Sequence, residues 1–251
     1  MNLKVINSNS KGNAYILEHE GSVILLECGV KFSEIKRGLD FDLKKVDACT
    51  ISHEHQDHAK AAKDIHAAGI PIITHFRTKV AIGINPNGWE IAHGQMILTK
   101  IKEHQNNSWQ VSAFHIDHDA VVPLGFIIEN SGIGHPVLFI TDTYKLRWNL
   151  KAKFKTVIIE ANYCENIAER RRKSKGNGFV EGRRLKNHMS FQTALKTLRK
   201  LDLSECENIV LIHLSDGLTD ETRFERVISE SFGIPCKCAK AGLELELDNP
   251  Y

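Results

Sequence analysis

Short apolar runs separated by polar turn residues dominate the first half of the chain. Residues 13–20, 22–29 and 45–51 are rich in aliphatic and β-branched side chains, and polar or glycine residues bound them. Runs of this length and composition predict β-strands that are largely buried. Strands of the same kind are expected at 3–8, 70–75, 95–101, 109–116, 123–130, 136–143, 156–162 and 208–215.

A helical period appears in three further segments. The alanine-rich segment 59–71 stops at Gly69 and Pro71, which are typical of a helix C-terminus. Ser190 is suited to cap a second helix, and the segment 220–233, which ends in glycine, predicts a third. The apolar face of the second helix would contain Phe191, Ala194, Leu195 and Leu198.

Two runs of strands, each followed by helices, indicate an α+β fold in which two sheets pack face to face with helices outside. The chain has 251 residues, no Pro/Gly-rich linker and no short repeat, so a single domain over residues 1–251 is preferred. Its net charge of +2 and its 42% hydrophobic residues are ordinary for a globular protein.

The same composition excludes several classes of protein. No apolar run approaches the roughly 20 residues of a membrane helix, and the N-terminal segment lacks the basic and apolar regions of a secretory signal. We therefore expect a cytoplasmic protein without a membrane partner. Six cysteines are scattered without a Cys-x-x-Cys pair, which argues against a disulfide framework and a structural zinc site. Most of them are expected to be small buried hydrophobic residues.

Residues 53–58 (HEHQDH) concentrate three imidazoles and two carboxylates between a predicted strand and a predicted helix. In an extended segment alternate side chains point the same way, so His53, His55 and Asp57 would converge while His58 points elsewhere. Imidazole and carboxylate groups form a ligand set suited to zinc, manganese or iron. The alternative, a solvated histidine-rich loop, is common for one or two histidines and is disfavoured for this denser motif.

Further candidate ligands lie where other predicted strands end. Asp142 follows the run 136–140, and His213 follows the run 208–212. A lone His or Asp at a strand end is usually a hydrogen-bonded structural residue. Together with the cluster, however, these groups supply enough ligands for two metals. A third strand end adds His115, Asp117, His118 and Asp119.

The order His-x-His-x-Asp-His, a distant His, an Asp after a strand and a late His resembles the metallo-β-lactamase-fold hydrolases. The resemblance runs from "SNSKGNAYILE" to "LIHLS", nearly the whole chain. The segments "SNSKGNAYIL", "HDAVVPLGF", "TDT", "EANYCENI" and "NHMS" resemble more closely the YycJ-type branch, small proteins described as nucleases. This resemblance implies an αββα four-layer sandwich with metals at one edge of the two sheets.

The resemblance also implies two divalent metal ions, with zinc as the favoured metal and manganese as the alternative. Asp142 would be shared between them, and the family's "HDA" segment selects His118 rather than His115. The family usually has Asp where this chain has Glu27, a carboxylate that supports the metal loops. The implied ligands are His53, His55, His118 and Asp142 for the first metal, and Asp57, His58, Asp142 and His213 for the second.

Two residues resemble features of tRNase Z, the transfer-RNA 3′-processing endonuclease. Glu160 ends a predicted strand, and His188 precedes the capped helix. The resemblance implies that Glu160 orients His188, which would protonate the leaving oxygen, while Asp57 would orient the attacking water. The alternative is a hydrogen bond between Glu160 and His188 that only anchors the loop.

A basic segment lies between these two residues. Such runs are usually solvated or disordered. Beside a metal site they can also bind phosphates, and nucleic-acid binding of this kind weakens steeply with salt. The residues assigned to this role are Arg170, Arg171, Arg172, Lys173, Arg183 and Arg184.

The favoured function is a dinuclear metal-dependent phosphodiesterase, a nuclease acting on DNA or RNA. The alternatives are a cyclic-nucleotide phosphodiesterase, a lactone or thioester hydrolase of the same fold, and a metal-stabilised binding protein. The last is disfavoured because a protein with a dead site would be expected to lose part of the ligand set. The partner would be a nucleic acid or nucleotide, and a homodimer is left open. The sequence does not distinguish DNA, RNA and a cyclic nucleotide as substrates, since all three present the same phosphodiester.

Overall fold

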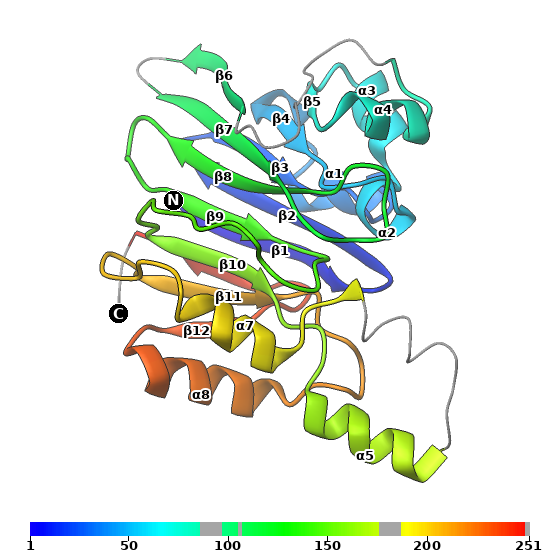
Figure 1. The fold of residues 1–251 in the computed structure, drawn as a ribbon. Coiled ribbons are helices and arrows are strands. Elements are labelled where there is room, and N and C mark those ends of the chain that lie inside the picture. Colours follow the sequence, from blue (N-terminus) through cyan, green and yellow to red (C-terminus); the bar gives the residue numbers. More distant parts are fainter. Residues whose placement is uncertain (86–96, 105–106, 176–186, 249–251) are drawn as a thin grey trace.

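The structure is a computed structural model of the 251-residue chain, and it describes residues 1–85, 97–104, 107–175 and 187–248. In this part of the chain two mixed sheets lie face to face (Figure 1). The first sheet runs in the order β13 (Glu244–Glu246), β1 (Asn2–Asn9), β2 (Gly12–His19), β3 (Ser22–Leu26), β4 (Val46–Thr50) and β5 (Ile72–Ile73).

The second sheet contains the remaining strands. Its order is β12 (Cys236–Cys238), β11 (Asn208–Ile212), β10 (Thr156–Glu160), β9 (Val137–Ile140), β8 (Leu124–Asn130), β7 (Asn107–His115) and β6 (Ile97–His104). Strands β9 to β12 are parallel, as are β3 to β5, whereas β6 to β9 and β1 to β3 are antiparallel.

Alternating side chains bury both faces of the inner strands. In β2, Tyr15 and Leu17 pack into the core between the sheets, while Ala14 and Ile16 pack under the helices outside. Strand β9 behaves in the same way, with Phe139 in the central core and Ile140 on the outer face. Because a strand has a side-chain period of two, apolar residues at every position require a layer on each side.

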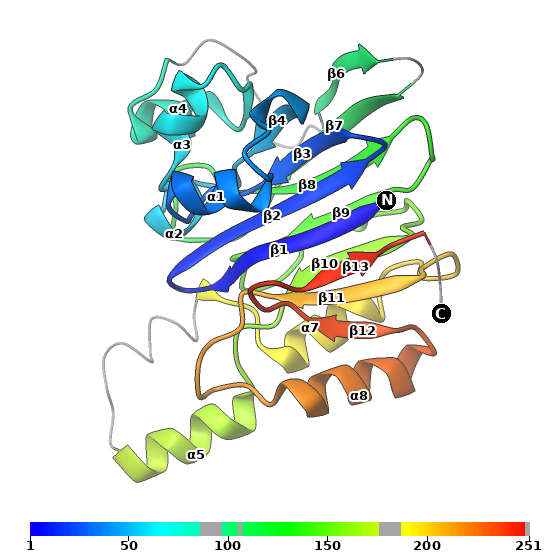
Figure 2. The ribbon, with the colours of Figure 1, turned by 180° about the vertical axis from the view of Figure 1, so that it is seen from behind.

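Helices supply those outer layers (Figures 1 and 2). The first sheet is covered by α1 (Phe32–Gly38), α2 (Gln56–Ala59), α3 (Ala62–Ala67) and α4 (Phe76–Ile82), with a 3₁₀ turn at Leu43–Lys45. The second sheet is covered by α7 (Phe191–Leu198) and α8 (Glu221–Phe232), and α5 (Glu165–Lys175) projects from the same side. The α+β, four-layer αββα architecture is thereby confirmed.

The predicted strands are all present, and Ser190 caps α7 by accepting a hydrogen bond from the backbone N of Thr193. Helices α1, α2, α4 and α5 and the short strands β12 and β13 were not predicted, because they are brief or lack a strong apolar period. All six cysteines are free thiols, and five are buried, as expected. No helix in the described ranges is long and apolar enough to span a membrane.

A close backbone contact ties the loop after β3 to the histidine-rich loop. The N–H of Cys28 donates to the carbonyl of His58, and the N–H of Gly29 donates to the carbonyl of Asn13, each over 2.8 Å. A Cβ at Gly29 would lie 1.7 Å from the carbonyl oxygen of Asp57. This approach excludes any side chain at position 29 unless the backbone moves.

We therefore predict that Gly29→Ala destabilises the fold by at least about 2 kcal/mol, because overpacking against backbone cannot be relieved by a rotamer change. The thermal unfolding midpoint should fall by roughly 4–8 °C. Gly38→Ala is the matched control, since its Cβ would meet only the side-chain tips of Ile6 and Ile16, at 3.1 Å. Equal losses in the two variants would contradict the role of the Gly29 contact.

Candidate metal centre

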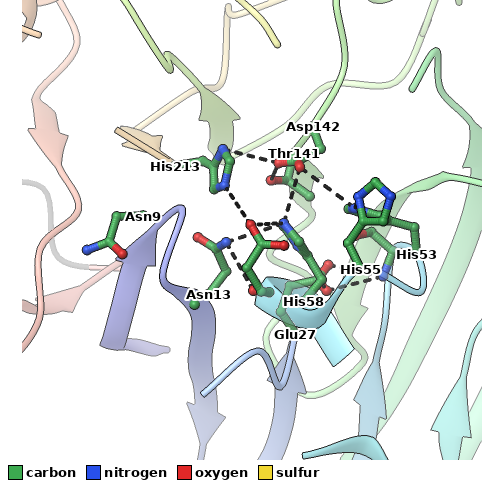
Figure 3. Close-up of polar contacts among 12 residues, drawn as sticks. Asn9, Asn13, Glu27, His53, His55, His58, Thr141, Asp142 and His213 are labelled. Atoms are coloured by element: carbon green, nitrogen blue, oxygen red, sulfur yellow. Dashed lines mark hydrogen bonds and ion pairs between the residues drawn. The ribbon is translucent and has the colours of Figure 1, made fainter. Parts of the chain in front are cut away.

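The ends of strands from both sheets converge on one group of imidazoles and carboxylates (Figure 3). The first group consists of His53, His55 and His118. His53 Nε2 lies 3.0 Å from His55 Nδ1, and His118 Nε2 lies 3.3 Å from the same atom. Three ring nitrogens that face one another without an intervening acid can bind a cation only when the rings are neutral.

Hydrogen bonds fix the far side of two of these rings. His118 Nδ1 donates to the carbonyl of Asn187 over 3.1 Å, which leaves Nε2 as the inward-facing atom. His53 Nδ1 lies 2.8 Å from the Ser52 hydroxyl. Burial lowers the pKa of His53 well below its usual range and lowers that of His118, so both rings favour the neutral form that binds metals.

The second group consists of Asp57, His58, Asp142 and His213. His58 Nε2 lies 3.2 Å from Asp142 Oδ2, and His213 Nε2 lies 3.5 Å from Asp57 Oδ2. Asp142 Oδ2 also lies 3.7 Å from His53 Nε2 and 3.6 Å from His118 Nε2. Asp142 is therefore located between the two groups, where the sequence comparison with the family had placed a shared ligand.

The expected side-chain directions within the cluster were wrong for Asp57. Simple alternation placed its carboxylate with His53 and His55, whereas it lies with His58 in the second group. The reason is that α2 begins at Gln56. Strand-like alternation therefore stops at His55, and the helical turn directs both Asp57 and His58 toward Asp142 and His213.

Three residues of this region have a left-handed backbone that non-glycine residues rarely adopt. The φ angles are 64° at Glu27, 38° at Asp142 and 55° at His213. Each such residue costs on the order of 1–3 kcal/mol, and outliers of this kind cluster at functional sites. All three follow the carboxyl end of a strand, so the strained turn aims each side chain across the edge of the sheets.

Opposite charges balance the burial of the second group. Burial opposes ionisation of Asp142, but the imidazoles of His213 and His58 outweigh it and hold the pKa of Asp142 well below its usual range. Burial likewise opposes protonation of His213, yet Asp142, Asp57 and Glu160 raise its pKa to about 10. An ionised Asp142 beside a protonated His213 is the charge state expected of a buried site in which a bound cation would replace the imidazole protons.

An unpartnered nitrogen and the types of donor atom both indicate that the second group suits a divalent metal. His213 Nε2 is buried and has no hydrogen-bond partner in the described structure, although it faces Asp57 Oδ2. Such an orphaned nitrogen is costly unless something else binds it. Imidazole nitrogens with carboxylate oxygens are the donors that zinc and manganese accept.

The Glu27 carboxylate contacts both the start and the end of the histidine-rich loop. Its side chain is fully buried, accepts from the backbone N–H of Ser52 over 3.1 Å and lies 3.4 Å from His58 Nδ1. Burial raises the pKa of this carboxyl, while His58 and Ser52 oppose that shift. The longer Glu therefore still reaches the loop at the position where the resembling family has Asp.

A polar chain beneath the site was missed by the sequence reasoning. The backbone N–H of His213 donates to the Ser8 hydroxyl over 2.9 Å, and that hydroxyl lies 2.8 Å from the Tyr15 hydroxyl. Tyr15 donates to Asn13 Oδ1 over 3.3 Å, and Asn13 Nδ2 donates to the carbonyl of Asp57 over 3.2 Å. The segment "SNSKGNAYIL" carries these residues, so the polar residues around its turn were the available signal.

Glu160 connects the metal-ligand candidates to His188. His188 Nδ1 donates to Glu160 Oε1 over 2.7 Å, and His213 Nδ1 lies 3.0 Å from the same oxygen. The other oxygen, Oε2, accepts from the backbone N–H groups of Thr143 and Met189, each over 3.0 Å. The contact expected between Glu160 and His188 is therefore present, and the contact with His213 was not foreseen.

Other predicted residues lie outside this centre. His115 Nε2 is buried away from the ligand groups, while the His115 carbonyl accepts from Trp148 Nε1 over 2.6 Å. Asp117 pairs with Arg147 at the surface. Arg170 to Lys173 are on the projecting helix α5, and Arg183 and Arg184 lie outside the described residues.

Known proteins resemble this chain in part or in fold. Exodeoxyribonuclease WalJ of Streptococcus pneumoniae is 24% identical over 133 residues, which are 47% of this chain and 46% of that protein. The matched chain thus spans about half the length of these curated relatives. The remaining half of each protein lies outside this similarity.

Two solved structures show the fold. YhfI from Bacillus subtilis is 15% identical, with a TM-score of 0.68 over 97% of this chain and 98% of that one. The short form of human tRNase Z is 14% identical, with a TM-score of 0.63 over 99% of this chain and 100% of that one. Residues 23–214 match the profile of the beta-lactamase superfamily domain. The chain therefore belongs to the beta-lactamase superfamily and has the metallo-β-lactamase fold.

Proposed function

We propose that this protein is a dinuclear metal-dependent phosphodiesterase that acts as a nuclease on DNA or RNA. The observation that carries the proposal is the position of Asp142 between two ligand groups, with the Glu160–His188 pair at its side. His188 Nδ1 lies 3.9 Å from Asp142 Oδ2, so the pair borders the candidate metal centre. The partial similarity to an exodeoxyribonuclease and the fold shared with tRNase Z support the choice of substrate.

Two divalent ions would be held there, with zinc as the favoured metal for both and manganese as the alternative. The first ion would take His53, His55, His118 and Asp142, and the second would take Asp57, His58, Asp142 and His213. Bound ions would supply a more acidic water and positive charge beside a phosphate. The rest of the chemistry is assigned to side chains of this chain.

Asp57 and His188 have complementary roles in this proposal. The Asp57 carboxylate, about a quarter exposed, would accept a hydrogen bond from the attacking water. His188 would protonate the departing alcohol oxygen. Burial opposes protonation of this ring, but the Glu160 and Asp142 carboxylates outweigh it and raise the pKa of His188. A protonated imidazole held by a carboxylate is suited to act as a general acid.

The projecting helix α5 is proposed to contact phosphates of a polymeric substrate. Arg170 and Arg172 are exposed on it, whereas Lys173 pairs with Glu169 over 2.9 Å. The helix begins five residues after Glu160, the last residue of β10, and projects away from the second sheet (Figure 1). Its length of 11 residues spans about 16 Å, which is enough to contact several phosphates of a strand.

The decisive experiment is hydrolysis by the purified protein, loaded with zinc or manganese. The substrates are labelled single- and double-stranded DNA, RNA, cyclic nucleotides, a lactone and a thioester. Cleavage of a polynucleotide is expected. Turnover of the lactone or thioester without any phosphodiester would refute the proposed reaction and leave the metal centre standing.

We predict two equivalents of metal per chain in dialysed protein, measured by elemental analysis. Asp142→Ala should lose both, because its carboxylate lies within 3.7 Å of imidazoles in both groups. His118→Ala should retain about one equivalent. His115→Ala is the matched control and should retain both. Full metal in the Asp142 variant, or a loss confined to the His115 variant, would contradict the ligand assignment.

His188→Ala should keep both metals and lose about 10²–10⁴-fold in kcat on a nucleic acid, because the variant lacks the proposed proton donor to the leaving oxygen. Bis(4-nitrophenyl) phosphate has an acidic leaving group, so the kcat of the variant on this substrate should fall far less. Glu160→Gln should show the same pattern more mildly. The control is His66→Ala, an exposed histidine on α3 that should behave as the parent protein does. Equal losses on both substrates would remove His188 from the acid role.

Arg170→Ala combined with Arg172→Ala should weaken binding of a single-stranded oligonucleotide and reduce its salt dependence. The slope of log K against log salt should become shallower by about 1.4, at roughly 0.7 for each lost phosphate contact. The matched control is the pair Arg223→Ala and Arg226→Ala, two exposed arginines on helix α8. An unchanged slope in the α5 variant would show that this helix does not bind phosphates.

A further inference from the structure

A large cavity adjoins the metal centre on the side of His188. Its volume is about 1220 Å³, somewhat above the usual 300–1,000 Å³ of pockets that hold a small molecule. Residues from four separate parts of the chain form its wall: the start of α4, the segment 115–123, the segment 144–148 and Asn187. None of the site residues proposed above lies in it except His118.

His118 and Asn187 connect the cavity to the candidate site. His118 Nε2 lies 3.6 Å from Asp142 Oδ2, and its Nδ1 donates to the carbonyl of Asn187. The rings of His118 and His188 have centroids 5.4 Å apart. A substrate with its phosphate at the ligand groups therefore has its next chemical unit at the entrance to this cavity.

Two aromatic side chains form part of the wall. Trp148 is held in place, because its Nε1 donates to the carbonyl of His115 and its ring contacts Phe114 edge-on at 6.5 Å. Tyr144 is 47% exposed, and Val121, which lines the same cavity, is 49% exposed. These are two of the four large hydrophobic residues that are strongly exposed in the described structure. An apolar surface concentrated at a cavity mouth indicates a binding site.

The same wall contains three cationic side chains, Arg77, Lys145 and Arg147, and two carboxylates, Asp117 and Asp119. Arg147 pairs with Asp117. Arg77 and Lys145 form no ion pair within the described ranges, and the Arg77 guanidinium lies 5.9 Å from the centroid of the Phe76 ring. Aromatic faces beside free cations are the combination that binds unpaired nucleobases and their phosphates.

We propose that this cavity binds the unpaired nucleotide adjoining the scissile phosphate, with the base against Tyr144 and Trp148 and the following phosphate near Lys145 and Arg77. The proposal rests on the proposed function and narrows its substrate to single-stranded nucleic acid or a frayed end. Bases in a duplex are covered on both faces by their neighbours and cannot use an aromatic wall.

Binding of mononucleotide to the metal-loaded protein tests the cavity separately from turnover. Isothermal titration calorimetry should show deoxyadenosine 5′-monophosphate binding at least about tenfold more tightly than inorganic phosphate, since stacking of one base accounts for a difference of this size. Tyr144→Ala should abolish most of this preference. Phe41→Ala is the matched control, an aromatic residue that is 70% exposed in the loop after α1.

Charge is tested in the same way with a dinucleotide. Lys145→Ala should weaken the binding of thymidylyl dinucleotide 5′-phosphate severalfold, whereas Lys151→Ala, which removes another exposed lysine outside the cavity, should not. Equal affinity for mononucleotide and phosphate in the parent protein, or a preference that survives both cavity variants, would overturn the proposal. A preference that depends on Tyr144 in a protein that cleaves no phosphodiester would retain the cavity and refute the proposed function instead.

Discussion

The Asp142 carboxylate is almost completely shielded from water, and the rest of the site depends on how it is compensated. A buried carboxylate is tolerated only where partners of opposite charge or hydrogen-bond donors surround it. The hydroxyl of Thr141 donates to it, and His58 and His213 lie within 3.2 Å of its two oxygens. His58 lies in α2, which follows β4 of the first sheet, and His213 follows β11 of the second, so this compensation requires the two sheets to meet in one register.

That requirement explains several otherwise unrelated features. Parallel strands bring their carboxyl ends to the same edge, which is where Asp142 and His213 follow β9 and β11 and where Glu160 ends β10. Left-handed turns then direct the side chains inward at an energetic cost. The apolar core between the sheets offsets that cost, because more than twenty buried residues pack there.

The hydrogen-bonded layer beneath the ligands has a second role. Ser8, Tyr15 and Asn13 connect the backbone of His213 to the backbone of Asp57 across the first strands of the chain. Glu160 connects His213 to His188 in the same manner. Side chains fixed on both sides in this way hold a cation-binding geometry without large rearrangement, which is how supporting contacts tune metal sites. His53, His118 and His213 thus each have a hydrogen-bond partner outside the candidate ligand set.

The sequence by itself determined the strands, the fold class and the chemical types at the strand ends. Those features are local, because a β-branched run that ends in His or Asp can be recognised within about ten residues of sequence. Tertiary structure decided the direction of Asp57, since a helical turn replaced the expected alternation at Gln56. It also decided which distant groups meet: the His213 N–H and the Ser8 hydroxyl are separated by 205 residues, and the cavity wall joins Arg77, Tyr144 and Asn187. No local pattern encodes such contacts, because they arise only when the packing of the two sheets fixes the relative positions of separate loops.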